Sequence, residues 1–525
     1  MKKAKHSLPF SALTLAFSLL ASGAAQAEWI KSYGTNNNEF GTVMPSSQDS
    51  YYLSMLSTSI STAKSVALLS LLDANGVPAW TKKITTGAFD SFLLSELNDG
   101  RLLLQGKTQL SANGSGNAVW AVYNVNRVTG ALSPVFSKSY PGKGNDELTI
   151  TQDNQGGLWG TGSTTSFSQD GKGKDMIVAK INATTGTPIW SKVFHSDYKD
   201  AIAAFIPQND KYILLANTTS TSGDSQKILI GLLNNLGAPV GSFKKFGGSG
   251  INNVVGIKAI SGGSYLVYGT NLANVQDQHP TIFVMKLSPL LKYVWGKKLT
   301  AGADQGMYVS DINENTDHSL TLTANLNATL YANFGGFKVP IGASAHPAAI
   351  QLSSAGAVTS AKSFEYQDTD TSNLYKTSNG NYLLGGQTSK AMDMTNPTMP
   401  NTDMLYGQFN ATMSPNWVKT LGGQNIDSGV ITSQPTGYLL SGATMSWSAG
   451  YMDLLAGKID ANGDVPGCTH INEVSMIETT PTISDSNLNW QAQTALLVNK
   501  GAITSTNIAI NVTPATMTTT TVCGN

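Results

Sequence analysis

Apolar residues recur along this chain at every second position or in short unbroken runs, and not at the 3.6-residue spacing of a helix. Alternating segments indicate half-buried strands, and unbroken runs such as 265–268 (YLVY) indicate strands covered on both faces. Turns of the form DANG, at 73–76 and 460–463, stand between such segments, because glycine tolerates the positive φ that a hairpin turn requires. The pattern predicts an all-β chain.

The predicted strands belong to a repeat. Eight times, an aromatic or small anchor residue is followed two positions later by lysine and ten positions later by a carboxylate or amide residue. The anchors are Trp29, Trp80, Phe136, Trp190, Ser242, Trp295, Ser360 and Trp417. The lysines are Lys31, Lys82, Lys138, Lys192, Lys244, Lys297, Lys362 and Lys419, and the third set is Glu39, Asp90, Asp146, Asp200, Asn252, Gln305, Asp370 and Asp427. Successive anchors are 51 to 65 residues apart, near the periods of propeller and solenoid repeats.

Each unit divides into four short strands: an anchor strand, a strand that begins near the acid, a strongly apolar strand, and a strand that ends in an Asx-Gly turn. Four antiparallel strands, repeated eight times without helices, favour radial blades over a solenoid. We therefore predict an eight-bladed β-propeller over residues 28–468 with four-stranded antiparallel blades. The unit from Trp295 to Ser360 is the longest, and its extra residues near 327–340 predict a protruding loop.

The first 27 residues have the features of a secretory signal. Lys2, Lys3 and Lys5 precede an apolar stretch, and residues 25–27 (AQA) form a small-residue cleavage site. The apolar stretch is shorter than a membrane span of about 20 residues, and no cysteine near the cleavage site predicts a lipid anchor. Cleavage would leave 30 basic and 33 acidic residues, which excludes the basic surface typical of nucleic-acid binding. We expect a secreted or periplasmic protein.

The two cysteines, Cys468 and Cys523, delimit a C-terminal tail, residues 469–525. An even pair in an exported chain indicates a disulfide rather than a metal site or a nucleophile. Ile508, Ile510 and Val512 alternate as in an edge strand, and residues 518–522 (TTTTV) have high β-propensity. The tail is interpreted as extra strands or a wrap on the propeller, with a disordered Thr-rich stalk as the alternative.

The units resemble the secreted bacterial and archaeal β-propeller repeats of the form W-x-K-x-[FY]-G-G-x-x-x-D, over residues 28–468. The segment 179–190 (AKINATTGTPIW) also resembles the blade motif of quinoprotein propellers, in which the tryptophan docks between blades. The first resemblance implies an exported propeller of undefined activity. The second implies eight-fold architecture but no quinone, because the chain lacks the adjacent cysteines of those dehydrogenases.

Candidate chemistry is sparse. The repeat lysine and acid flank one predicted hairpin, so we expect structural ion pairs across strands or blades, formed by the eight lysines with Glu39, Asp90, Asp146, Asp200, Asp370 and Asp427. The five histidines after the leader, His195, His279, His318, His346 and His470, stand alone in sequence and form no zinc or haem motif. Met392, Met394 and Met399 are interpreted as a plastic loop rather than a copper site. No catalytic, cofactor-binding or metal-binding residues are predicted.

The sequence therefore predicts a non-catalytic binding or surface-interaction module whose partner is a glycan, a protein or an envelope component. Loops on a rigid scaffold commonly carry such functions. Two alternatives stay open: a propeller enzyme, either quinoprotein-like or glycan-active, and a structural subunit of an extracellular assembly in which the tail is the connector.

Overall fold

The computed structural model describes residues 28–524, apart from 47–49, 60–64, 87–88, 110–115, 141, 143, 154, 168–172, 209, 221–224, 249, 275–278, 303–304, 335–336, 367–368, 390–401 and 489. In these residues the only helical segment is a three-residue 3₁₀ turn, η1 (Ser261–Gly263), so the predicted all-β class is confirmed. The predicted leader and the three loop methionines lie outside the described residues.

Most strands form antiparallel groups of four that are consecutive in sequence. Group one contains β2 (Asn38–Pro45), β3 (Tyr51–Thr58), β4 (Ser65–Leu72) and β5 (Pro78–Thr85). Group two contains β6 (Phe89–Glu96), β7 (Leu102–Gln109), β8 (Gly116–Val125) and β9 (Leu132–Tyr140). Group three contains β10 (Asp146–Gln152), β11 (Leu158–Thr164), β12 (Asp175–Ile181) and β13 (Pro188–His195). Group four contains β14 (Lys199–Gln208), β15 (Lys211–Thr219), β16 (Gln226–Asn234) and β17 (Pro239–Phe246).

The same order continues in the second half of the chain. Group five contains β18 (Ile251–Ala259), β19 (Tyr265–Leu272), β20 (Thr281–Leu287) and β21 (Tyr293–Ala301). Group six contains β22 (Gln305–Glu314), β23 (Leu320–Phe334), β24 (Phe337–Leu352) and β25 (Val358–Glu365). Group seven contains β26 (Thr369–Lys376), β27 (Tyr382–Ser389), β28 (Thr402–Phe409) and β29 (Pro415–Leu421). Group eight contains β30 (Asp427–Ser433), β31 (Tyr438–Thr444) and β32 (Asp453–Ile459), completed by β1 (Trp29–Gly34) from the other end of the chain.

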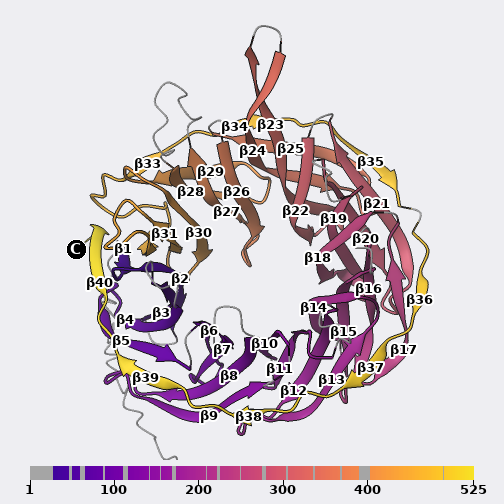
Figure 1. Ribbon diagram of the computed structural model, residues 1–525. Helices are drawn as coiled ribbons and strands as arrows, with labels where there is room; N and C mark the ends of the chain where they lie inside the picture. The colour runs from indigo at the N-terminus through magenta and orange to yellow at the C-terminus, as the bar shows by residue number, and fades with distance from the viewer. Residues whose placement is uncertain are drawn as a thin grey trace, which may run out of the picture.

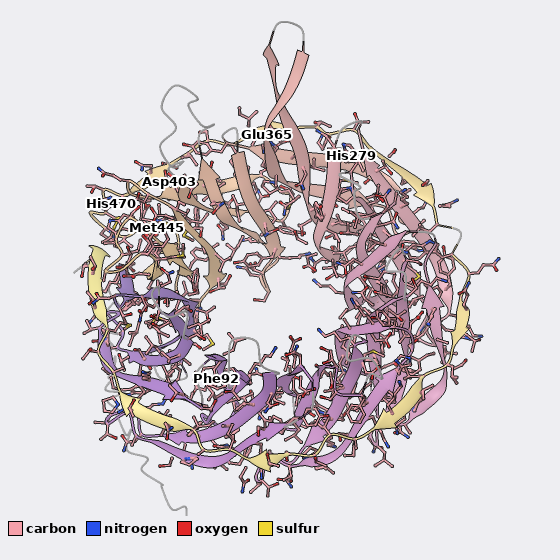
Figure 2. The ribbon with its side chains drawn as sticks, in the orientation of Figure 1. Phe92, His279, Glu365, Asp403, Met445 and His470 are labelled. Atoms are coloured by element: carbon pink, nitrogen blue, oxygen red, sulfur yellow. A yellow bond between two sulfur atoms is a disulfide. The ribbon has the colours of Figure 1, made fainter. Side chains whose placement is uncertain are left out.

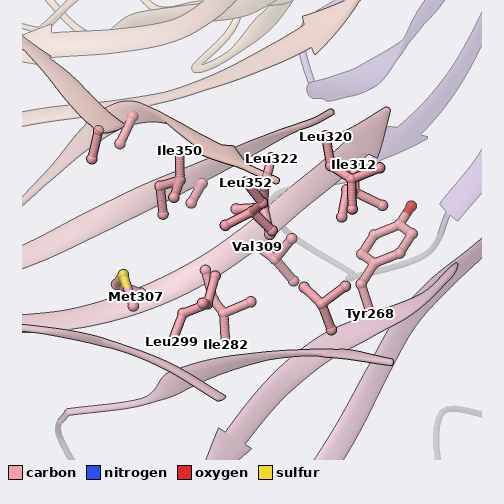
Figure 3. Packing of buried hydrophobic residues seen from close by; sticks show 14 of the residues in the cluster. Tyr268, Ile282, Leu299, Met307, Val309, Ile312, Leu320, Leu322, Ile350 and Leu352 are labelled. Atoms are coloured by element: carbon pink, nitrogen blue, oxygen red, sulfur yellow. The ribbon is translucent and has the colours of Figure 1, made fainter. Parts of the chain in front are cut away.

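The groups are arranged in a ring around a common centre, with the first strand of each group on the inside (Figure 1). Each first strand contacts the second or third strand of the preceding group, and β2 of group one contacts β31 and β32 of group eight. Buried apolar residues fill the junctions between groups. In the junction between groups five and six, for example, Ile282 and Leu299 pack against Met307 and Val309 (Figure 3). Each group therefore hides its apolar faces against its two neighbours.

The sheet boundary lies elsewhere than predicted. The anchor residue begins no new sheet: its strand is the outer, fourth strand of a group and pairs with the strand before it, as β5 pairs with β4. The connection from anchor strand to acid strand is therefore a crossover between groups and not a hairpin. At several junctions a single parallel bridge joins neighbouring groups, as between Ser65 of β4 and Phe89 of β6.

The tail gives each group a fifth strand, so the prediction of four-stranded sheets is corrected. Its strands are β33 (Ile471–Glu473), β34 (Ile477–Thr479), β35 (Ile483–Asn487), β36 (Gln493–Ala495), β37 (Val498–Gly501), β38 (Thr506–Asn507), β39 (Asn511–Pro514) and β40 (Thr518–Cys523). They pair antiparallel with the outer strands of groups seven, six, five, four, three, two, one and eight, in that order. This segment, residues 471–523, is called the belt, and it follows the outer circumference of the ring (Figure 1).

The belt covers the backbone edges that the outer strands would otherwise leave unpaired. An open edge strand is a template for association with another chain, and short, interrupted strands make poor templates. The belt strands are two to six residues long. The belt ends at the predicted disulfide: Cys468 and Cys523 are joined, with a Cα–Cα distance of 5.1 Å.

The anchor tryptophans connect neighbouring groups. The indole Nε1 of Trp29 on β1 donates a hydrogen bond to the Ala74 carbonyl, 3.0 Å away in the β4–β5 turn of group one. Gly76 of that turn has a φ of 72°, and a Cβ there would lie 2.5 Å from the Trp29 ring. Glycine is required twice over, for the positive φ and for the close approach. The same pairing joins Trp80 with Gly130, Trp190 with Gly237, Trp295 with Gly356 and Trp417 with Gly463.

Where the anchor is serine, the turn changes with it. The residues at the positive-φ position are then Leu291 (φ 56°) and Met413 (φ 61°), which follow the Ser242 and Ser360 units. Both side chains are buried in the junction clusters. A large side chain is therefore supplied by the anchor when the turn has glycine, and by the turn when the anchor is small.

The predicted protruding segment is a hairpin. Strands β23 and β24 pair along their whole length to Phe334 and Phe337, and they project from the ring beyond group six (Figure 1).

Candidate functional site

The repeat acids cap turns. The carboxylate of Asp200 accepts hydrogen bonds from the amides of Ser196 (2.7 Å) and Asp197 (3.2 Å) in the preceding crossover. Asp427 accepts in the same way from Gly423, and Glu39 from Thr35. These acids lie at the start of each innermost strand, so the hydrogen bonds hold the crossover that brings the chain from one group to the next. For Asp90 and Asp370, the structure describes the strands but not the side chains.

The repeat lysines have other partners than predicted. Because each lysine is on an outer strand, the belt is its neighbour, and four of them contact belt side chains: Lys138 with Asn507, Lys244 with Thr494, Lys297 with Asp485 and Lys362 with Glu478. Lys419 pairs with Asp464 at 2.6 Å. Among the described side chains, no ion pair joins a repeat lysine to Glu39, Asp146, Asp200 or Asp427, and the pairing predicted for Asp90 and Asp370 falls on side chains that the structure does not describe. The lysines lie on the outer strands of the groups and the acids at the start of the innermost strands.

A second acid faces the repeat acid in some junctions. Asp453, the first residue of β32, lies beside Glu39 of group one, and its carboxylate accepts a hydrogen bond from the Ala449 amide. Burial, with the nearby negative charge of Glu39, raises the pKa of Asp453 to about 6. Burial likewise raises the pKa values of Asp146, Asp200 and Asp427, against hydrogen bonds that act in the opposite direction. These junctions hold carboxylates that resist ionisation.

Replacing Asp453 with asparagine should stabilise the protein at pH 7 by about 1–3 kcal/mol. Folded Asp453 binds its proton more tightly than the unfolded chain does, so its contribution to stability is present below about pH 4 and is lost as pH rises to 6. Asparagine removes this loss and keeps a carbonyl oxygen for the Ala449 amide. Urea unfolding at pH 4.5 and pH 7 measures the difference, which should be smaller at pH 4.5. Asp317→Asn on an exposed turn is the control and should bring no gain; an Asp453→Asn variant less stable at pH 7 than the parent would contradict the assignment.

A groove of about 410 Å³ lies between groups three and four. Its walls are the exposed face of β10, part of β11, Lys174, and residues 201–205 of β14. Polar groups on these walls are the hydroxyls of Thr149, Thr151, Thr161 and Ser163 and an ion pair between Lys174 Nζ and Glu147 Oε2 at 3.3 Å. Ala201, Ile202, Ala203, Ala204 and Phe205 supply an apolar surface beside them.

The groove lies beside a bulge in β14, and a bulge at the equivalent position of β18 carries the larger Val255. The register of β14 with β15 shifts between Ile202 and Ala204, so Ala203 lies at a bulge. Bulges bend a strand and re-aim its side chains. Ala203 also occupies the position three residues after the repeat acid, where group five has Val255 and group six has Tyr308, both exposed. A small residue at the bulge leaves this junction open.

A smaller pocket of about 150 Å³ lies between groups five and six, beside Trp295. On its rim, Glu314 accepts hydrogen bonds from the Ser261 amide (2.7 Å) and hydroxyl (2.6 Å), and the Glu314 carboxylate also meets His318 Nδ1 at 3.2 Å. Partial burial acts to raise the pKa of Glu314, but these hydrogen bonds together lower it. His318 has a φ of 64° at a turn position where Gly100, Gly156 and Gly380 stand in other groups.

This Ser–His–Glu cluster lacks the arrangement of a hydrolytic triad. Both Ser261 Oγ and Glu314 Oε1 approach the same ring nitrogen, Nδ1 of His318, at 3.1 and 3.2 Å. In a triad the base bonds the nucleophile through one nitrogen and its orienting carboxylate through the other. The geometry therefore describes a hydrogen-bonded surface network and not an activated nucleophile.

The histidines stand alone in the sequence, but the structure brings two of them into clusters with acidic side chains. His195 lies beside two acids, Asp175 and Asp200, and His318 belongs to the pocket rim. His279 and His470 lie at well-separated points of the ring (Figure 2). The groove was not predicted, because its polar residues are scattered threonines without a motif.

No protein-family model matches the chain, and no curated protein matches it. Solved structures that align with it include a polysaccharide lyase described as a PL25 ulvan lyase (8% identity, TM-score 0.39, covering 83% of this chain and 96% of that one). Others are a GH43 β-1,3-galactosidase (12%, TM-score 0.27, 83% and 95%) and the extracellular domains 1–2 of Drosophila semaphorin 1a (11%, TM-score 0.31, 82% and 88%). At these TM-scores the similarity carries no information on function. Among the described residues, no helix is long and apolar enough to cross a membrane.

Proposed function

We propose that this chain is an eight-bladed β-propeller exported from the cytoplasm that acts as a non-catalytic binding module for a polyhydroxylated ligand, a glycan or glycan-bearing envelope component. In this proposal each four-stranded group is one blade. Three features support it: a scaffold with its outer edges covered, a disulfide of the kind formed in oxidising compartments, and a groove whose walls mix hydroxyls, a carboxylate, an ammonium group and apolar surface.

The groove between groups three and four is the observation that carries the proposal. Binding sites typically combine apolar walls with a few placed polar groups. A sugar ring presents hydroxyls at its edges and C–H groups on its faces, and the groove offers partners for both. The four hydroxyls, with Glu147 and Lys174, suit the edges, and Ile202, the alanines and Phe205 suit the faces.

Binding is favoured over glycoside hydrolysis by the carboxylates of the groove. Most glycosidases place two carboxyl groups on either side of the scissile bond. Glu147 is the one carboxylate among the described residues that line the groove, and it is paired with Lys174. The neighbouring Asp175 and Asp200 are 1% and 0% exposed, so they cannot reach a ligand in the groove.

The alternative of a structural subunit with the tail as connector is disfavoured by the belt. Each of its strands pairs with an outer strand of the same chain, so this segment is used inside the molecule.

Ala203→Trp should abolish glycan binding, because an indole at the bulge fills the groove. Val255→Trp is the matched control: it places the same side chain at the equivalent position of group five, and binding should remain within about twofold of the parent protein. A glycan array on the mature protein, followed by calorimetry with the best ligand, measures the effect. Lys174→Met should weaken the same binding about tenfold, the loss of one charge-assisted hydrogen bond.

Three outcomes would count against the proposal. If Val255→Trp lost as much glycan binding as Ala203→Trp, the binding site would lie elsewhere. If the parent protein bound no glycan on the array and nothing in envelope extracts, the proposed ligand class would be wrong. If the parent protein cleaved a glycan into shorter sugars and Glu147→Gln did not, the enzyme alternative would be supported instead.

A further inference from the structure

His195 stands at a position that varies among the units: three others have glycine there, and the remaining four have Thr85, Pro141, Thr300 and Glu365. It is the fifth residue after its anchor, Trp190, and the corresponding residues after Trp29 and Trp417 are Gly34 and Gly422. At these glycines an added Cβ would lie 2.1 Å from Asp453 Cγ and 1.8 Å from Asp403 Oδ1. The glycine makes room for the acid at the start of the third strand. In group three a histidine occupies that place, and its Nδ1 lies 2.7 Å from Asp175 Oδ1.

The two acids beside His195 are buried in the junction. Asp175 is 1% exposed and Asp200 is 0% exposed, and they belong to different groups. A parallel bridge between Lys174 and Lys199 brings their strands together, and the Asp200 amide donates to the Lys174 carbonyl at 2.7 Å. Ligand atoms of Asp175, His195 and Asp200 all lie within 4.8 Å of one another.

Two carboxylate oxygens in this cluster, Asp175 Oδ2 and Asp200 Oδ1, have no hydrogen-bond partner. Asp175 Oδ1 meets His195, but Asp175 Oδ2 is buried and accepts no hydrogen bond. Asp200 is held at Oδ2 by the Ser196 and Asp197 amides. Burying two carboxylates without matching positive charge is costly, and one histidine brings at most a single charge. Either a proton or a bound cation can supply the missing positive charge, and the histidine beside the two acids favours a metal cation.

We propose that Asp175, His195 and Asp200 bind a divalent transition-metal ion, Zn²⁺ in preference to Ca²⁺ or Mg²⁺. One imidazole nitrogen with two carboxylate oxygens is a ligand set that suits zinc, whereas calcium and magnesium take oxygen ligands alone. Ligand atoms about 2.1 Å from a tetrahedral ion are about 3.4 Å apart, so atoms now within 4.8 Å reach the ion by small side-chain rotations. The ion joins β12 and β13 of group three to β14 of group four.

The site is structural and distinct from the groove. Its acids are almost wholly buried and none of its three residues lines the groove wall. The metal would fix the relative position of Lys174 and Ala201, the neighbours in sequence of Asp175 and Asp200, which do line it. The metal proposal does not depend on the proposed ligand of the groove.

The test uses mature protein without a polyhistidine tag, stripped with EDTA. Calorimetry with ZnCl₂ should give one equivalent bound, and CoCl₂ should give visible d–d absorption of a four-coordinate nitrogen–oxygen site. His195→Gly is the informative variant, because glycine is the residue that three other units have at this position. It should lower zinc affinity at least a hundredfold and remove the cobalt spectrum, while His318→Ala, which changes the other clustered histidine, should leave both unchanged.

Zinc should also raise the melting temperature of the parent protein and not that of His195→Gly, since an ion that binds only the folded state stabilises it. Equal zinc binding by the parent and His195→Gly, or no bound zinc and no cobalt spectrum in the parent, would overturn the proposal. If His195→Gly does not fold, Asp175→Asn tests the same site. Stabilisation of the parent by acid alone, without any metal effect, would show that a proton and not a metal satisfies the cluster.

Discussion

Cys523→Ser should lower the free energy of unfolding by about 4 kcal/mol, among the largest effects of any single substitution in this chain. In the chain-entropy model, a disulfide that closes a loop of 55 residues removes this much freedom from the unfolded state. The folded state also loses the closure of the belt, because Cys523 ends β40, the strand that pairs with β1. Chemical unfolding of the oxidised and variant proteins measures the loss.

The pattern of variants separates this effect from local packing. Cys468→Ser, Cys523→Ser and the double variant should lose the same stability, because each opens the same covalent ring. Treatment of the parent with a reductant should reproduce the loss and leave the double variant unchanged. Additive losses in the double variant would contradict the assignment and point to packing of the two side chains.

Opening the ring should also expose the belt selectively. Belt strands hold to the groups by short backbone pairings and by side chains such as Lys297–Asp485 and Lys138–Asn507. Hydrogen exchange should therefore accelerate first in β39 and β40, which lose their covalent tie to the ring, and later in β33 to β36, which stay joined through the backbone to β32. Uniform acceleration over all groups would show that the disulfide supports the ring as a whole and not the belt.

Much of the ring can be predicted from the local sequence. The period of anchors and the DANG turns predict strands and their number because each contact between neighbouring groups uses one anchor and one turn, as the Trp–Gly contact does in five of the units. The sheet boundary was misplaced, because a lysine and an acid eight residues apart look alike whether a hairpin or a crossover separates them. The strand pairing shows a crossover.

The belt was harder to predict than the groups. Ile508, Ile510 and Val512 alternate as predicted, and they pack on the cluster between groups one and two. Other belt strands, such as β38 with two residues, are too short to show an alternation of apolar and polar residues. The repeated lysine was the available signal: a charge on every outer strand indicates a polar neighbour along the whole circumference.

The metal-binding candidate could not be recognised as a motif within the repeat. Its three residues come from three strands, and the histidine stands alone in sequence. The available signal was a histidine five residues after the anchor, at a position where the first and last units have glycine. Its meaning is visible only once the contact of those two glycines with an acid on the neighbouring strand is known.

Trp29→Ala should lower stability by about 3–5 kcal/mol, the usual cost of removing a fully buried tryptophan. The Trp29 ring is 0% exposed, its edge meets the Tyr51 ring at a centroid distance of 5.8 Å, and its Nε1 bonds the Ala74 carbonyl. The effect should exceed that of Trp190→Ala, because the Trp190 ring is partly exposed although it makes the equivalent hydrogen bond to Asn235. Trp29→Phe keeps a ring against Gly76 and should lose less than half as much.

Unlike the other anchors, Trp29 lies on the strand that closes the ring. Its strand, β1, pairs with β32 on one side and β40 on the other, so it joins the N-terminal end of the chain to group eight and to the end of the belt. Weakening this strand opens the ring at its closure, and limited proteolysis of Trp29→Ala should therefore cut first near residues 29–34 and 518–523. Cleavage first in groups three to six, or a loss no larger than that of Trp190→Ala, would show that the ring is not held closed here.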